Sequence, residues 1–161
     1  MSQIALGNLT ANVAADWDVQ GMLTITLPST DPNVKPNVIL TKEQLPREVD
    51  LNEYFDKIKE SIQKRGIKDL KISDERDIAI SGVRGKMMIC SWDVSAMAEM
   101  MAQQNPNQKA PAIKPGQIVK QVQVTLLKDQ MAINMTASFP NEKFTDYYKP
   151  FQEFLKSLKF D

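Results

Sequence analysis

The sequence predicts an α+β protein in which a mainly antiparallel β-sheet carries two helices packed on one face. Three observations predict this fold class. Several stretches alternate apolar and polar residues, as half-buried strands do. Two longer stretches repeat apolar residues at helical spacing. The strand-like stretches are joined by short, turn-rich segments, which favours antiparallel pairing over parallel crossovers.

The first strand pair is expected at residues 22–28 and 37–41. The first stretch alternates, with Leu23 and Ile25 on one face and Thr24 on the other. The second stretch is a short β-branched run. The sequence between them, PSTDPNVKP, is rich in turn residues, so we expect a hairpin-like connection.

A helix is expected to begin after Asp50. The side chain of Asp50 can cap the first turn, and Glu53 three residues later gives a capping-box arrangement. Apolar residues then recur at helical spacing as far as Ile62, while charged residues occupy the opposite side. Gly66 suits a left-handed C-terminal cap. We therefore predict an amphipathic helix that packs by one face.

Three further strands are expected at residues 70–73, 78–83 and 86–92. A turn between the last two is predicted at Gly82 and Gly85, because glycine tolerates the backbone angles that tight turns need. These strands follow the first helix along the chain. The order of elements therefore favours a single sheet that contains strands from before and after this helix.

A methionine-rich segment follows these strands. Residues 95–104 are expected to form a short helix, and residues 105–115 a mobile loop within a single domain of residues 1–161. Methionine is flexible and polarisable, which suits surfaces that accept varied apolar partners, although core methionine is the commoner case. The predicted rim of a binding groove is Met97, Met100 and Met101.

The clearest hairpin joins QIVKQVQVTLL to QMAINMTASF through a turn near residues 128–130. A second helix is expected after it, because aromatic and aliphatic residues recur at helical spacing from Phe144 to Leu158. Pro150 should kink this helix or start a new one. The aromatic side of the helix is large enough to cover a sheet.

One set of alternating side chains is polar but almost free of charge. An ordinary solvated sheet face carries more lysine and glutamate, which suit water and discourage association. Uncharged hydroxyl and amide groups among methionine and isoleucine can instead make directed hydrogen bonds once water is displaced. The alternative is a plain solvated sheet, since threonine favours strands anyway. The partner-binding residues predicted on this face are Met22, Thr24, Ile39, Thr41, Gln121, Gln123, Asn134 and Thr136.

Composition argues against several classes of function. Twenty basic and twenty acidic residues cancel, so no overall field attracts nucleic acid or an anionic membrane. The absence of histidine removes the commonest general base and metal ligand. The acidic residues Asp74, Glu75 and Asp77 are interpreted as a charged turn. We expect no enzymatic activity, no cofactor and no metal.

Location is predicted from the N-terminus and the cysteine content. The first residues lack the basic and apolar regions of a signal peptide, and no window is apolar enough to span or anchor in a membrane. A single cysteine, Cys90, excludes an internal disulfide and suits a reducing compartment. We expect a cytoplasmic protein with Cys90 buried as a small hydrophobe.

The order of several short stretches resembles a known family. These are DW at residues 16–17, NVIL at 37–40, DLNEYFDKI at 50–58, Gly82 in a strand pair, and QVQVTLL and INMTASFP before the aromatic helix. Together they resemble the DcrB-related family, whose members have a PsbP-like α+β sandwich, over residues 6–160. The chain looks most like its cytoplasmic branch, the Eag chaperones of type VI secretion effectors.

The resemblance implies a function that suits the uncharged face. Such chaperones bind and shield hydrophobic, prospective transmembrane segments near the N-terminus of a secreted effector before it is loaded, and they typically act as homodimers. We therefore expect a chaperone or adaptor for such segments. The second hypothesis is a structural or assembly subunit that uses the sheet for protein–protein contacts, and a dimer that is stable without a hydrophobic client would favour it.

Overall fold

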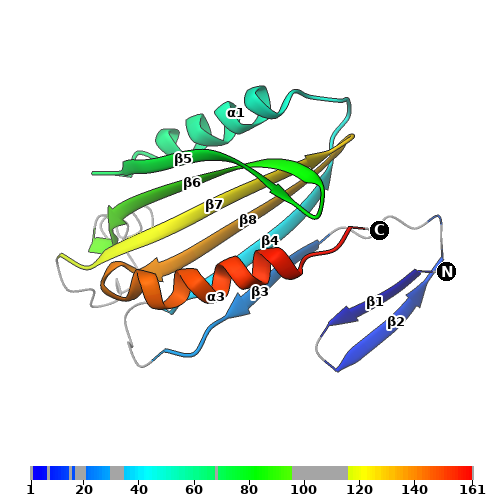
Figure 1. Cartoon of the computed structure of the whole chain (residues 1–161), viewed down its shortest axis with the longest axis horizontal. Coiled ribbons are helices and arrows are strands. Elements are labelled where there is room, and N and C mark those ends of the chain that lie inside the picture. The colour runs from blue at the N-terminus through cyan, green and yellow to red at the C-terminus, as the bar shows by residue number, and fades with distance from the viewer. Residues whose placement is uncertain are drawn as a thin grey trace, which may run out of the picture.

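The computed structural model of the protein describes residues 2–6, 8–14, 16, 21–29, 35–67, 69–95 and 116–160. Its elements in chain order are β1 (Ser2–Leu6), β2 (Leu9–Val13), β3 (Gly21–Thr26), β4 (Asn37–Gln44), α1 (Leu51–Lys64), β5 (Lys71–Ile80), β6 (Val83–Asp93), β7 (Ile118–Lys128), β8 (Met131–Pro140), the 3-10 helix η1 (Asn141–Lys143) and α3 (Phe144–Ser157). A six-stranded antiparallel sheet has the order β3-β4-β8-β7-β6-β5, and β1 and β2 form a separate hairpin (Figure 1). The predicted α+β class, with an antiparallel sheet and two helices, is confirmed.

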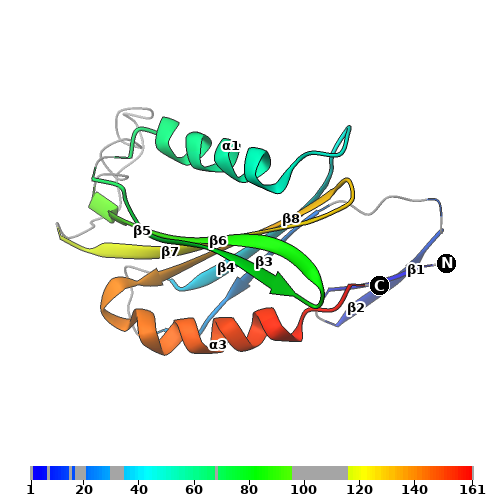
Figure 2. The same ribbon diagram turned by 45° about the horizontal axis from the view of Figure 1, so that its top comes forward.

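The two helices lie on opposite faces of the sheet, which corrects the prediction that both pack on one face (Figure 2). In α3, Phe151 and Leu155 belong to a large core that includes Met87 of β6. In α1, Phe55 packs with Met88 of the same strand. Neighbouring residues of a strand point to opposite faces, so the sheet separates the two helices.

The composition of β6 explains why each face needs a helix. Met87 and Ile89 are buried on the α3 side, whereas Met88, Cys90 and Trp92 are buried on the other side. A strand that is apolar on both faces must be covered on both, as in sheets sandwiched between helices. The uninterrupted apolar run in the sequence MMIC is the signal of this arrangement.

The main core lies between the sheet and α3. Val122, Val124 and Leu126 of β7 are fully buried there, as their alternation predicts. Phe139 at the end of β8 lies at the centre of an aromatic cluster. Its ring centroid is 5.6 Å from that of Tyr147, 6.0 Å from that of Phe151 and 6.1 Å from that of Phe144.

The start of α1 follows the predicted capping pattern in part. Asp50 Oδ1 accepts hydrogen bonds from the backbone N–H of Asn52 (2.9 Å) and of Glu53 (3.3 Å), which satisfies two free donors of the first turn. The Glu53 carboxylate pairs with Lys57 at 2.9 Å instead of bonding back to the cap. Gly66, at φ 66°, ends the helix as expected.

The turn of the β5–β6 hairpin differs from the prediction. Ser81 and Gly82 form it, with φ of 48° and 78°. Gly85 lies inside β6, where it faces Leu126 of β7 across the sheet. A Cβ at Gly85 would lie 2.5 Å from Leu126 Cδ2 and closer still to the Thr125 carbonyl oxygen. Gly85 is therefore required by close packing and not by the turn.

The acidic stretch SDERD is part of strand β5, which corrects its interpretation as a turn. Asp74 points to the α3 side of the sheet, and Glu75 and Asp77 point to the α1 side. Each carboxylate pairs with a different basic residue: Arg76–Asp74 at 3.1 Å, Lys59–Glu75 at 3.2 Å and Lys86–Asp77 at 2.9 Å. The three carboxylates do not form a cluster.

Some predictions concern other parts of the chain. Pro150 lies inside α3, which continues on both sides of it although the proline lacks an N–H to donate. The predicted rim residues Met97, Met100 and Met101 and the predicted loop 105–115 lie outside the described residues. None of the helices in the described part of the chain has the length and hydropathy needed to cross a membrane.

Candidate partner-binding face

The strand register places all eight predicted sheet residues on one face, which is the face that carries α1. Met22 is opposite Thr41 and Thr24 is opposite Ile39. Across the next pairs, Ile39 meets Thr136 and Thr41 meets Asn134, and Thr136 in turn meets Gln123. We call this surface the polar face, formed by the side chains of Met22, Thr24, Thr26, Asn37, Ile39, Thr41, Glu43, Gln121, Gln123, Thr125, Ala132, Asn134, Thr136 and Ser138.

The polar face has one charged residue, Glu43. The Glu43 carboxylate accepts a hydrogen bond from the Tyr54 hydroxyl at 2.8 Å, so it is held near the N-terminal end of α1. The rest of the face offers hydroxyl, amide and aliphatic groups. Removing water from such a surface costs less free energy than removing it from a surface rich in lysine and glutamate, because charged groups are the most costly to desolvate.

Helix α1 covers only part of this face (Figure 2). Its apolar side packs on Met88 of β6 through Phe55 and Ile62. Beyond the helix, towards β3, the side chains become accessible. Met22 is 70% exposed, and Ile39 is half-buried. The polar face is therefore open on β3, partly accessible on β4 and β8, and buried at Gln123 and Thr125 of β7.

A cavity of ≈ 380 Å³ lies where α1 meets the open part of the face. Four of its lining residues were predicted from the sequence, namely Gln121, Gln123, Asn134 and Thr136. The others are Glu43, the α1 residues Ile58, Ser61 and Ile62, and Arg65 at the C-cap of α1. These residues were not predicted, because α1 was expected on the other face. Their helical spacing on one stripe, at 58, 61, 62 and 65, was the available signal.

A chain of hydrogen bonds fixes the polar groups between the sheet and α1. The Thr125 hydroxyl donates to Asn134 Oδ1 at 2.8 Å. Asn134 Nδ2 donates to the Tyr54 hydroxyl at 2.8 Å, and that hydroxyl donates to Glu43. Because Thr125 is fully buried, its hydroxyl depends on this partner.

Tyr54 keeps its proton throughout the ordinary pH range. Burial raises its pKa to about 12, and the hydrogen bond to Glu43 acts in the same direction, while the bond from Asn134 opposes it. The hydroxyl therefore remains the donor towards Glu43. This neutral hydroxyl links α1 to Glu43 and Asn134 of the polar face, in addition to the Lys59–Glu75 ion pair and the packing of Phe55 on Met88.

Two further pairs cross between β7 and β8. The Thr136 hydroxyl donates to Gln123 Oε1 at 2.7 Å, and Gln121 Nε2 donates to Ser138 Oγ at 3.2 Å. Among the described residues, the NH2 group of Gln123 and the side chains of Ser61 and Arg65 have no hydrogen-bond partner. Donors are thus available along the cavity between α1 and the sheet.

Cys90 lies beside these amides and is fully buried, as predicted. Its thiol lies 3.9 Å from Gln121 Oε1, to which it donates weakly. Burial raises the pKa of the Cys90 thiol to about 11. The side chain therefore stays a neutral thiol at physiological pH and contributes packing to the face.

Several solved structures are similar to this chain. PA94 from Pseudomonas aeruginosa, a protein of unknown function, has a TM-score of 0.69 at 14% identity, covering 100% of this chain and 97% of its own. LpqN of Mycobacterium tuberculosis, involved in cell envelope biogenesis, has a TM-score of 0.50 at 13% identity, with coverages of 89% and 84%. The cyanobacterial PsbP of Synechocystis, CyanoP, has a TM-score of 0.47 at 8% identity, with coverages of 85% and 79%.

No protein-family model matches the chain, and no curated protein matches it. The similarity to PA94 and LpqN, both below 25% identity, shows a common fold. Because one fold hosts many functions, function must be argued from the polar face itself.

Proposed function

We propose that the protein is a binding protein whose polar face takes up an apolar helical segment of a partner protein. The observation that carries this proposal is the accessible, nearly uncharged surface of β3, β4 and β8 beside α1, on a sheet whose opposite face already carries the main core under α3. A solvated surface of this size would be expected to carry more charge.

The dimensions of the open surface suit one helix. Two strand spacings separate β3 from β8, which amounts to about 10 Å. β8, with 10 residues, extends about 33 Å. An apolar helix of about 20 residues is about 30 Å long and at least about 10 Å wide. One such helix would lie beside α1 along β4 and β8.

The chemistry of the surface suits a helix taken from a membrane environment. Met22 and Ile39 offer apolar contacts, and Thr24, Thr41 and the free Gln123 amide offer hydrogen bonds. Helices that associate within membranes use the same combination of small-residue packing and hydroxyl or amide contacts. An exposed apolar helix would otherwise aggregate in water.

The resemblance to the DcrB-related family supplies a specific client class for this surface. On that basis we propose that the protein is a chaperone or adaptor that shields prospective transmembrane segments of a type VI secretion effector before loading. The chaperone would act in the cytoplasm as a non-enzymatic homodimer.

A solubility assay tests the proposal. A fluorescein-labelled 20-residue peptide of leucine, alanine and glycine is diluted out of detergent, and the labelled peptide left in the supernatant is measured. Wild-type protein should keep the peptide in solution. Thr24→Lys and Thr41→Lys should lose most of this effect, because a lysine would have to be desolvated against the apolar helix. Thr145→Lys, an exposed threonine of α3, is the matched control. Equal retention by all three variants would exclude the polar face as the binding surface.

The outer edge of β3 favours a second candidate, an assembly subunit that pairs with its own copy. β3 is an edge strand without a charged residue, and Met22 and Leu23 are 70% and 38% exposed. Natural edge strands usually carry charges that prevent pairing. Sedimentation equilibrium without any peptide should then show a dimer that Leu23→Lys converts to a monomer. A wild-type monomer at high protein concentration would remove this candidate.

A further inference from the structure

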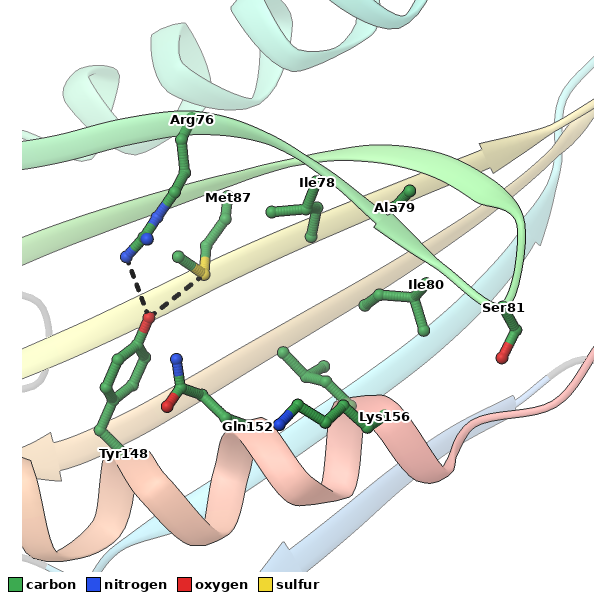
Figure 3. Close-up of a pocket in the computed structure, with 10 residues that line it drawn as sticks. Arg76, Ile78, Ala79, Ile80, Ser81, Met87, Tyr148, Gln152 and Lys156 are labelled. Carbon is green, nitrogen blue, oxygen red and sulfur yellow. Dashed lines mark hydrogen bonds between the residues drawn. The ribbon is translucent and has the colours of Figure 1, made fainter.

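A second groove lies on the other face of the sheet, between the edge strand β5 and helix α3 (Figure 3). Its cavity measures ≈ 320 Å³. The apolar part is formed by Ile78 and Ile80 of β5, Met87 of β6 and Leu155 of α3. The sheet separates this groove from the polar face, so it can act independently of the function proposed above.

The groove follows the backbone of the edge strand. Ile78 and Ile80 point towards α3, whereas the side chain of Ala79 between them points to the opposite face (Figure 3). Ala79 nevertheless lines the groove, so the backbone around it forms part of the wall. Among the described strands β5 is the last of the sheet, and none of them pairs with its outer N–H and C=O groups.

The groove is basic at its polar positions. Arg76 and Lys156 are among the ten residues that line it, and no acidic residue is. The Arg76 guanidinium donates to the Tyr148 hydroxyl of α3 at 3.2 Å, and that hydroxyl contacts Met87 Sδ at 3.8 Å (Figure 3). The guanidinium is thereby held between the strand and the helix, at one end of the apolar wall.

We propose that this groove binds an extended acidic peptide, which adds to β5 as a further strand. Backbone hydrogen bonds to the free edge would supply affinity, and alternate side chains would enter the space between β5 and α3. One carboxylate would meet Arg76, and apolar side chains two and four residues away would cover Ile78 and Ile80. An acyl chain could fill the apolar space but could not use the strand backbone.

Two features of β5 define where the added strand lies. A register irregularity falls between Ile72 and Asp74, and the first half of the strand carries most of its charges. Both features discourage pairing along that half. The second half, from Arg76 to Ile80, has a regular register and two charged residues, Arg76 and Asp77. The peptide therefore pairs along the second half.

In the structure, Arg76 and Lys156 each form an ion pair with a residue that does not line the groove. Arg76 pairs with Asp74 at 3.1 Å, and Lys156 pairs with Glu153 at 3.0 Å. All four side chains are largely exposed, and ion pairs of this kind contribute little to stability. A peptide carboxylate can replace Asp74 as the ion-pair partner of Arg76 with little loss of stability. It then pairs with a guanidinium that its hydrogen bond to Tyr148 already holds in place.

Fluorescence anisotropy with designed peptides tests this proposal. The probes are two seven-residue peptides of threonine with glutamate, valine and valine at alternate positions, in that order and in the reverse order, to allow either strand direction. At least one should bind wild-type protein in a saturable manner. Arg76→Glu should weaken binding about tenfold, the value of one charge-assisted hydrogen bond. A lysine-for-glutamate peptide should prefer the Arg76→Glu variant.

The controls separate strand addition from binding by charge or by apolar contact alone. Arg84→Glu, at an exposed arginine of β6 outside the groove, should leave binding unchanged. N-methylation of alternate peptide nitrogens should abolish binding, and amide exchange in β5 should slow when the peptide is bound. Any of three outcomes would overturn the proposal. These are that neither peptide binds, that Arg76→Glu binds the peptide as well as wild type does, or that decanoate displaces the peptide and N-methylation has no effect.

The same variants distinguish this groove from the polar face. Thr24→Lys should leave binding of the acidic peptide unchanged, and Arg76→Glu should leave retention of the apolar helical peptide unchanged. If Thr24→Lys abolished binding of the acidic peptide, the groove assignment would be wrong, whatever the outcome for the polar face.

Discussion

The two faces of the six-stranded sheet are formed by the same strands but have different roles. On the α3 side, Val122, Val124 and Leu126 are fully buried beneath a helix that supplies Phe151. On the α1 side, the alternate residues of β7 and β8 pair by hydrogen bonds, and only part of the face is covered. The difference teaches that period-2 alternation lets one hairpin stabilise the fold on one side and present a binding surface on the other.

The energetic contributions of the two faces differ accordingly. Burial of one large apolar side chain contributes about 1.5–3 kcal/mol. A hydrogen-bonded polar pair contributes about 0.5–1.5 kcal/mol net, because it replaces bonds to water. Stability should therefore depend mainly on the α3 side, and substitutions on the polar face should be felt mainly in binding.

The largest effect on stability is expected at the aromatic cluster of the α3 side. Phe139→Ala should lower the free energy of unfolding by about 3–5 kcal/mol, because it removes a fully buried ring that contacts three other aromatic rings. Urea unfolding measures the change. A loss below about 1 kcal/mol would show that the α3 side is not the main core.

The next largest effect is expected where β6 and β7 approach most closely. Gly85→Ala should cost about 3 kcal/mol, because its methyl group would overlap Leu126 and the backbone of β7. Gly21→Ala in β3 is the control, since no atom lies within 4 Å of its added Cβ. Unfolding curves of the two variants should differ clearly in midpoint. Equal midpoints would contradict the close packing at Gly85.

On the polar face, Thr136→Val should cost about 2 kcal/mol, because it leaves Gln123 Oε1 without its donor at a position only 6% exposed. Adding Gln123→Met should recover much of this loss, since both members of the pair are then apolar. A double-mutant cycle measured by urea unfolding gives the coupling. Strictly additive effects of the two substitutions would show that the pair does not interact.

The smallest effect is expected at the contact between α1 and the polar face. Tyr54→Phe should cost about 1 kcal/mol at pH 7. Because the pKa of Tyr54 is raised to about 12 in the folded protein, the unfolded chain loses this proton first and wild type loses stability as the pH rises above about 10. The Phe variant lacks that loss, so the difference between the two proteins should shrink as the pH rises from about 10 to about 12. A constant difference would contradict the burial of Tyr54.

Much of this arrangement was predictable from the sequence for physical reasons. Side chains alternate with a period of two along a strand. The eight predicted residues therefore had to share one face once the strands were placed and paired. The cap at Asp50 and the turn near Asp129 follow from local chemistry. These features depend on residues that are close in sequence or in simple register.

The side of the sheet that each helix covers was not predicted. That choice depends on contacts between distant residues, such as Phe55 with Met88. The apolar run from Met87 to Cys90 indicated burial on both sides of its strand, but both helices were expected on one face. The cavity residues Ser61 and Arg65 were missed for the same reason, because their position depends on the placement of α1.

Site-specific photocrosslinking tests the central claim most directly. A benzophenone side chain is placed at Thr24, at Ile39 or, on the opposite side of the sheet, at Thr145, and the protein is irradiated with the labelled 20-residue apolar peptide. Crosslinks are expected from Thr24 and Ile39, and none above background from Thr145. Crosslinks mainly from Thr145, or equal yields at all three positions, would contradict the assignment of the polar face as the surface that binds an apolar helix.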